Sequence, residues 1–205
     1  MKKAAMFGLD ARIALAIFGA LSVISGAALY SAIQSSKVTS SIASLNEVLK
    51  SVEAYMLDTG QDLPNGKIGA TSYAFAFDGL GLIEDNSVSG WNGPYISLQK
   101  NSAAPNYNLI GYKDAGSILA TVHIKKAMNN TWDTPDTDGV CDGSSACFVW
   151  IENAYMTDIA KAIDIMVDGS DSATTGNLRY KIKDAGDPSR GSAVYLKGPL
   201  TLNQN

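Results

Sequence analysis

The densest group of potential metal ligands in this chain is an acidic run at 133–142. Gly, Thr and Pro residues separate its carboxylates, which belong to Asp133, Asp136, Asp138 and Asp142. Carboxylate oxygens that converge in a tight loop are the ligands that Ca²⁺ prefers. No Glu stands at the twelfth position, as an EF-hand requires, and Asp-Gly pairs also form ordinary turns. The run is therefore a candidate calcium site, and the sequence requires no cofactor.

The chain contains two cysteines, Cys141 and Cys147, which enclose only five residues. In an oxidising compartment such a pair is expected to form a disulfide. The spacing differs from that of a Cys-x-x-Cys redox motif. We therefore predict a structural bond that stabilises the fold by about 2 to 3 kcal/mol, mostly by restricting the unfolded chain.

The sequence offers few groups for enzymatic chemistry. The single histidine, His123, lies in an apolar run, where a strand residue is expected rather than a general base. No Gly-rich phosphate loop or Gly-x-Ser-x-Gly elbow is present, so we predict a protein that is not an enzyme. The 16 basic and 20 acidic residues give a formal charge of −4, which argues against nucleic acid as a partner. We expect the clustered basic side chains to form a solvated face: Lys125, Lys126, Arg179, Lys181 and Lys183.

A long apolar segment near the N-terminus would anchor the chain, and with it the acidic run, the cysteines and the basic side chains, at a membrane. Ile13–Ile33 is 21 residues without a charged side chain. As a helix it would be about 31 Å long, enough to cross the hydrocarbon core of a bilayer. It could be a secretory signal cleaved at Ser25-Gly26-Ala27, a plain membrane anchor, or the stem of a filament subunit. Lys2 and Lys3 precede it and favour a cytoplasmic N-terminus.

Helical patterning continues beyond this apolar segment. An apolar stripe at steps of three and four follows it: Val38, Ile42, Leu45, Val48, Leu49, Val52, Tyr55 and Met56. No proline lies between Met1 and Leu63, so we predict one helix from about Leu9 to about Leu57. A cleaved signal has no reason to continue into an amphipathic helix. Asp10 and Arg12, placed directly before the apolar run, also argue against a secretory signal.

The segment Lys2-Lys3-Ala4-Ala5-Met6-Phe7-Gly8-Leu9-Asp10, with the apolar helix after it, resembles the N-terminus of type IV pilins and type II secretion pseudopilins. The resemblance implies that a prepilin peptidase removes the leader 1–5 by cutting between Ala5 and Met6. Met6 would then be methylated, Asp10 would be the fifth mature residue, and Gly19 the fourteenth. The family usually has Gly, Phe and Glu where this chain has Ala5, Met6 and Asp10. Cutting after Gly8 instead would put Ile13 at the fifth position.

The resemblance gives Asp10 a role in assembly. An unpaired carboxylate at bilayer depth is costly, and in a pilin-like filament its partner is the α-amino group of a neighbouring subunit's first residue, here Met6. The alternative is that Asp10 pairs with Arg12 at the level of the headgroups, although side chains two apart do not share a helix face. Small residues such as Gly19 would let apolar helices approach closely.

The remainder, residues 59–205, is expected to be a globular α+β domain in which the amphipathic half of the helix at 6–58 packs on an antiparallel sheet. Alternation and turn residues predict a loop at Ser89–Ile96 that leads into a strand, and a second helix at Tyr155–Met166. They also predict strands at Tyr73–Phe77, Asn108–Tyr112, Ile118–Ile124, Cys147–Ile151, Leu178–Ile182 and Ala193–Leu196.

The resemblance as a whole implies a structural subunit that polymerises with copies of itself into a helical filament. The precursor would sit in the inner membrane, be cut by the prepilin peptidase, and be placed by pilus assembly machinery in an extracellular filament on a bacterial surface, where it serves adhesion, motility or attachment. One alternative is a pseudopilin, whose filament stays periplasmic. Another is a secreted binding domain with a cleaved signal.

Overall fold

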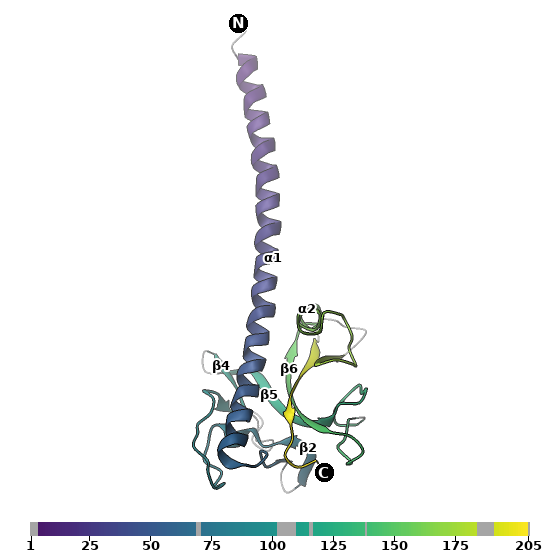
Figure 1. Ribbon diagram of the computed structural model, residues 1–205. Coiled ribbons are helices and arrows are strands. Elements are labelled where there is room, and N and C mark those ends of the chain that lie inside the picture. The colour runs from purple at the N-terminus through teal and green to yellow at the C-terminus, as the bar shows by residue number, and fades with distance from the viewer. Residues whose placement is uncertain are drawn as a thin grey trace. The chain divides into compact units, whose positions relative to one another are not determined.

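The computed structural model has the α+β organisation that the sequence predicts (Figure 1). It describes residues 4–68, 71–101, 110–114, 117–137, 139–183 and 191–204. The chain divides into two units, Met1–Ser40 and Ser41–Asn205, and helix α1 crosses the boundary between them without a break.

Helix α1 spans Ala4–Thr59. The prediction of one uninterrupted helix is confirmed, and the helix extends beyond the expected limits at both ends. It ends at Gly60, whose φ of 65° lies in the left-handed region that glycine adopts without strain. The amide of Gly60 donates to the carbonyl of Met56 at 2.9 Å, which satisfies one of the last free carbonyls of the helix.

The apolar segment of α1 lies in the first unit. Its large apolar side chains are exposed there, from Ile33 at 45% to Val23 at 74%. By length and composition this segment can cross a membrane. A helix that is apolar on every side needs lipid or other apolar helices around it, since water solvates such a surface poorly.

The second unit is built on an antiparallel sheet in the order β1-β2-β5-β6-β8-β7, with β4 paired to both β5 and β3. The strands are β1 (Asn65–Ile68), β2 (Thr71–Phe77), β3 (Gln99–Lys100), β4 (Ile110–Asp114), β5 (Ser117–Met128), β6 (Cys147–Tyr155), β7 (Leu178–Ile182) and β8 (Ser192–Leu200). The long strand β5 is central, because its first half pairs with β4 and its second half with β6.

Alternation along the strands divides the side chains between two faces of the sheet. A Cβ placed on Gly198 of β8 would collide with Leu49 of α1, so residues 41–59 of α1 pack on the face that includes Gly198. We call this the α1 face. The apolar sheet residues buried on it include Val122, Ile124, Val149, Ile151, Val194 and Leu196, and those of α1 include Leu45, Val48, Leu49, Val52, Tyr55 and Met56. Apolar burial between these two sets stabilises the fold of the second unit.

Helix α2 spans Thr157–Asp168, between β6 and β7. It starts two residues later than predicted because β6 continues to Tyr155. Gly169, with a φ of 78°, ends the helix in the left-handed conformation. The helix buries Ile159, Ala160 and Ile163 together with one carboxylate, that of Asp164.

The predicted strands agree with those observed, with two kinds of exception. Part of the strand expected at Asn108–Tyr112 lies outside the described residues, and strand β4 begins at Ile110. The short strand β1 was not predicted.

The segment that follows the 3₁₀ helix η1 (Gly79–Leu82) contains the predicted loop at Ser89–Ile96, which leads into the short strand β3 as expected. Aromatic packing holds this loop in place. The Tyr95 ring lies 5.7 Å from Tyr55 of α1 and 5.9 Å from Trp91, both edge to face, and the Trp91 indole donates to the carbonyl of Gly81 at 2.8 Å.

Candidate functional site

The predicted assembly residues lie in the first unit, on α1. Ala5 and Met6 belong to the helical backbone, while their side chains are outside the described part. Asp10 and Arg12 are both exposed, and none of the ion pairs between described residues joins them. Gly19 has open space where a Cβ would stand. The first unit thus contains one acid, Asp10, just before the long apolar surface of α1. No other described part of the first unit covers that surface.

The face of the sheet opposite the α1 face is covered by the loop between β5 and β6 (residues 129–146, of which 138 is not described). Trp132 of this loop is 2% exposed and packs edge to face on Trp150 of β6 and Tyr195 of β8, with ring centres 4.8 and 5.4 Å apart. Its indole donates to the carbonyl of Met128 at 2.8 Å. The loop therefore has its own aromatic anchor in the sheet.

Two of the four predicted calcium ligands instead pair with lysines. The Lys125 ammonium lies 2.9 Å from an Asp136 carboxylate oxygen and 3.6 Å from one of Glu152. Asp133 pairs with Lys181 of β7. The pairs of Asp136 and Asp133 hold the loop to strands β5 and β7.

The other two predicted ligands do not complete a site within the described residues. Asp142 accepts a hydrogen bond from the amide of Ser144 at 2.9 Å, and bonds from Ser144 lower the pKa of Asp142. Asp138 lies outside the described residues. Nowhere in the described part of the chain do three His, Cys, Asp or Glu side chains gather as metal ligands. Calcium binding by this loop therefore stays a prediction.

The predicted disulfide between Cys141 and Cys147 is confirmed, with the two Cα atoms 5.9 Å apart. Cys147 is the first residue of β6 and is fully buried. Its amide donates to the Gln204 side chain at 2.8 Å, and its carbonyl accepts from the amide of Thr201 at 3.0 Å. The bond thus links the covering loop to the sheet at the point where the C-terminal segment also docks.

The expectation of a solvated basic face was wrong for three of its members. Lys125, Lys126 and Arg179 are only 7%, 5% and 2% exposed. Strand alternation distinguishes two faces but does not say which is covered. The β5–β6 loop covers Lys125 and Arg179 on the second face, whereas Lys126 is paired with Val149 and therefore lies on the α1 face. His123 lies in β5 as predicted, and burial lowers its pKa.

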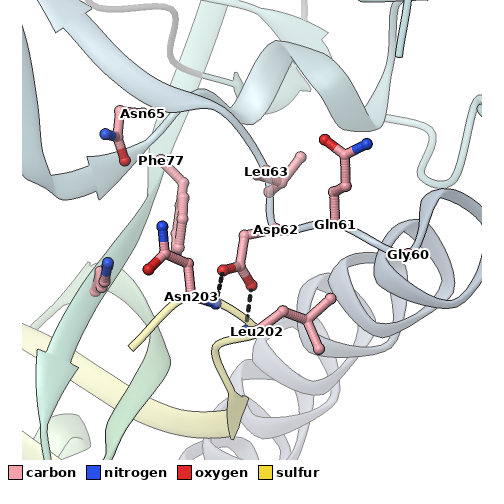
Figure 2. A pocket seen from close by; sticks show the side chains of 9 residues that line it. Gly60, Gln61, Asp62, Leu63, Asn65, Phe77, Leu202 and Asn203 are labelled. Atoms are coloured by element: carbon pink, nitrogen blue, oxygen red, sulfur yellow. Dashed lines mark hydrogen bonds between the residues drawn. The ribbon is translucent and has the colours of Figure 1, made fainter. Parts of the chain in front are cut away.

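A polar pocket of about 420 Å³ lies in the second unit beside the end of α1 (Figure 2). Its wall includes Asp62, whose two carboxylate oxygens accept from the amides of Leu202 and Asn203 at 2.8 and 2.7 Å. Gln61, Asn65 and Lys126 also line it. Because the Asp62 carboxylate already binds two backbone amides, its first effect is to hold the C-terminal segment in place.

An apolar groove of about 410 Å³ lies between the end of α1 and the end of β8. Leu202 lines both this groove and the polar pocket. Leu57 is 84% exposed, Leu200 51% and Leu202 57%. Sequence reasoning missed this groove, although one signal was present: Leu57 lies off the apolar stripe that packs on the sheet. Contiguous patches of exposed large apolar side chains are typical of interaction surfaces.

The comparisons with known proteins assign no family to this chain. No family model, no curated protein and no solved structure matches this chain.

Proposed function

We propose that the chain is a structural subunit of a type IV pilus-like filament that polymerises through the N-terminal part of α1. The observation that carries this proposal is the continuity of α1. One helix contains an exposed apolar segment long enough to cross a membrane and also packs on the sheet of the second unit. The same apolar surface suits lipid before assembly and neighbouring helices after it.

Asp10 gives the polymer its register in this proposal. A carboxylate at the start of an apolar helix is stabilised when a cation approaches it in a medium of low dielectric constant. The α-amino group of Met6 in a neighbouring copy would supply that cation. A docking error would leave both charges unpaired, so correct stacking is favoured over sliding of one helix along another.

The apolar groove of Leu57, Leu200 and Leu202 supports the same proposal. Its occupant would be a second copy of the chain, because each copy also carries the uncovered apolar surface of α1. Assembly would then remove from water two surfaces that the monomer leaves exposed.

The test is a pair of substitutions on α1 made in the full chain. Asp10→Ala is expected to abolish filaments seen by electron microscopy, while the subunit remains in the membrane fraction. Glu47→Ala, an exposed acid further along the same helix, is the matched control and should leave filaments intact. Normal filaments from Asp10→Ala would contradict the role given to this carboxylate.

Determination of the mature N-terminus separates the alternatives. A terminus at Met6 supports a pilin or a pseudopilin, whereas one near Ala28 supports a secreted binding domain and overturns the proposal. Sheared surface material then distinguishes the first two, since a pilus would be recovered from it and a periplasmic pseudopilus would not.

A further inference from the structure

Arg179 of β7 is a buried cation that contacts no acidic side chain within the described part of the chain. It is 2% exposed and makes no ion pair with any described residue. Asp168, the acid that acts on it from a distance, already accepts from the amide of Leu178 at 2.7 Å and from the Asn177 side chain at 3.2 Å. Buried charges in proteins are normally paired, so this guanidinium needs an explanation.

Aromatic stacking provides part of that explanation. The guanidinium carbon lies 4.3 Å from the centre of the Trp132 ring and 4.7 Å from that of Trp150. Nη1 donates to the carbonyl of Asn130 at 2.6 Å, and Nη2 makes only a long contact of 3.4 Å with Asn129 Oδ1. The Nε–H group is buried and has no hydrogen-bond partner among the described residues. The stacking compensates the charge without consuming all of its donors.

A second cation stands close to Arg179. Lys197 of β8 has its ammonium 4.0 Å from the centre of the Phe148 ring and makes no ion pair with the described residues either. Burial, and after it the charge of Arg179, lower the pKa of Lys197, and burial lowers that of Arg179 to about 10. Two positive charges therefore repel each other here in a chain whose net charge is negative.

A pocket of about 250 Å³ opens over these two cations. Its polar lining consists of Asn129, Thr131, Thr175, Asn177, Arg179 and Lys197, and no carboxylate is among its described lining residues. The pocket, which we call the basic pocket, thus combines two cations with neutral amides and hydroxyls. Amides and hydroxyls are groups that hydrogen-bond to the hydroxyls of a polar ligand.

We propose that the basic pocket binds a small oxyanion presented on a hydroxylated ligand, and that the carboxylate of a sugar acid is the chemistry that fits it best. The oxyanion would lie between Lys197 and Nη2 of Arg179, and its binding would relieve the repulsion between them. The amides and threonines at the opening would contact ring hydroxyls. This inference does not rest on the proposed function, because it concerns a pocket within the second unit and can be tested on dispersed subunits.

The experiment uses the full chain dispersed in detergent micelles at fixed ionic strength. Methyl glucuronide, methyl glucoside and inorganic sulfate are titrated separately, with saturation-transfer NMR of the sugars and the fluorescence of Trp132 and Trp150 as readouts. Glucuronide is expected to bind, the neutral glucoside to bind at least about tenfold more weakly, and sulfate to compete with glucuronide.

Lys197→Gln is the informative variant, because Lys197 lies at the partly exposed side of the pocket and its loss leaves the Arg179 stack in place. The Kd for glucuronide should rise about tenfold in Lys197→Gln, as expected for one lost hydrogen bond to a charged group. It should be unchanged in Lys100→Gln, an exposed lysine of β3 outside the pocket.

Three results would overturn the proposal. Glucoside could bind as tightly as glucuronide, Lys197→Gln could bind glucuronide like the unaltered chain, or glucuronide could show no binding at all. In the last case, binding of sulfate alone would reject the sugar acid as the occupant, while a lack of binding by either ligand would reject the oxyanion site. Arg179→Gln is not a substitute test, because it also removes the centre of the aromatic stack.

Discussion

The buried carboxylate of Asp164 in α2 should make the stability of the second unit depend on pH. Asp164 is fully buried, and one of its oxygens accepts from the amide of Ser172 at 2.6 Å while the other has no partner among the described residues. Burial, followed by the negative charges of Asp168 and Asp171, raises the pKa of Asp164 to about 6. Burial, and after it the hydrogen bond to Asp171 and the charges of Asp171 and Asp164, raise the pKa of Tyr180 of β7 as well.

The direction of the effect follows from proton linkage. The pKa in the folded state, about 6, lies above the unfolded value of 3.8. The folded chain therefore binds more protons between these values, and the free energy of unfolding decreases as the pH rises from about 4 to about 6. A difference of about two pKa units corresponds to a loss of about 2 to 3 kcal/mol, which is complete above pH 6 or so.

The measurement compares the unaltered chain with Asp164→Asn, which keeps an acceptor for Ser172 and removes the charge. Urea unfolding at pH values from about 4 to about 7.5 can be followed by tryptophan fluorescence, because all three tryptophans lie in the second unit. The difference in unfolding free energy between the two proteins should change by about 2 to 3 kcal/mol over this range. Taking the difference also cancels the opposite contribution of His123, whose lowered pKa makes stability rise with pH.

Asp158→Asn is the control, since Asp158 is exposed on the same helix and should leave the pH profile unchanged. Parallel profiles for the unaltered chain and Asp164→Asn would refute the reasoning, because the carboxylate would then ionise at the same pH in the folded and unfolded states.

Further predictions concern the covering loop, the groove and the C-terminal segment. Replacing Cys141 and Cys147 together by Ser should lower the free energy of unfolding by about 2 to 3 kcal/mol, to be checked by urea unfolding against the unaltered chain treated with reductant. Trp132→Ala should cost about 3 to 5 kcal/mol in the same assay, and a loss below 1 kcal/mol would show that the loop is not anchored by this side chain. Leu57→Gln should reduce filament yield in electron microscopy without a shift in melting temperature, because the side chain is 84% exposed in the single chain. Asp62→Ala should cost about 1 to 3 kcal/mol and abolish hydrogen-exchange protection of the two amides that Asp62 holds, and unchanged protection would reject this role.

The elements that the sequence predicts well are those with strong local signals. The length of α1 follows from an apolar pattern with no proline, and β7 was predicted from the alternation of Leu178, Tyr180 and Ile182. The disulfide was also predictable, because two cysteines so close in the chain have few other partners. In each case the information lies within a few residues.

The features that the sequence could not predict depend on residues far apart in the chain. Arg179 alternates with apolar residues just as Lys181 does, and only the pairing of β7 with β8 and the return of the β5–β6 loop bury it. Likewise, Asp62 accepts a hydrogen bond from the amide of Leu202, which lies 140 residues further along the chain. The acidic run at 133–142 has turn composition, which predicted a loop but could not show that lysines of β5 and β7 would pair with its carboxylates.

The way the β5–β6 loop is fastened suggests a practical use for its tip. Anchors on the sheet hold the loop through Trp132, Asp133 and Asp136, and the disulfide closes it, while residues 142–146 remain exposed. A foreign peptide inserted among residues 142–146 would leave the Trp132 anchor, the two ion pairs and both cysteines in place. If the subunits assemble as proposed, such a graft would appear once per copy, and the protein would become a scaffold for dense, evenly repeated peptide display.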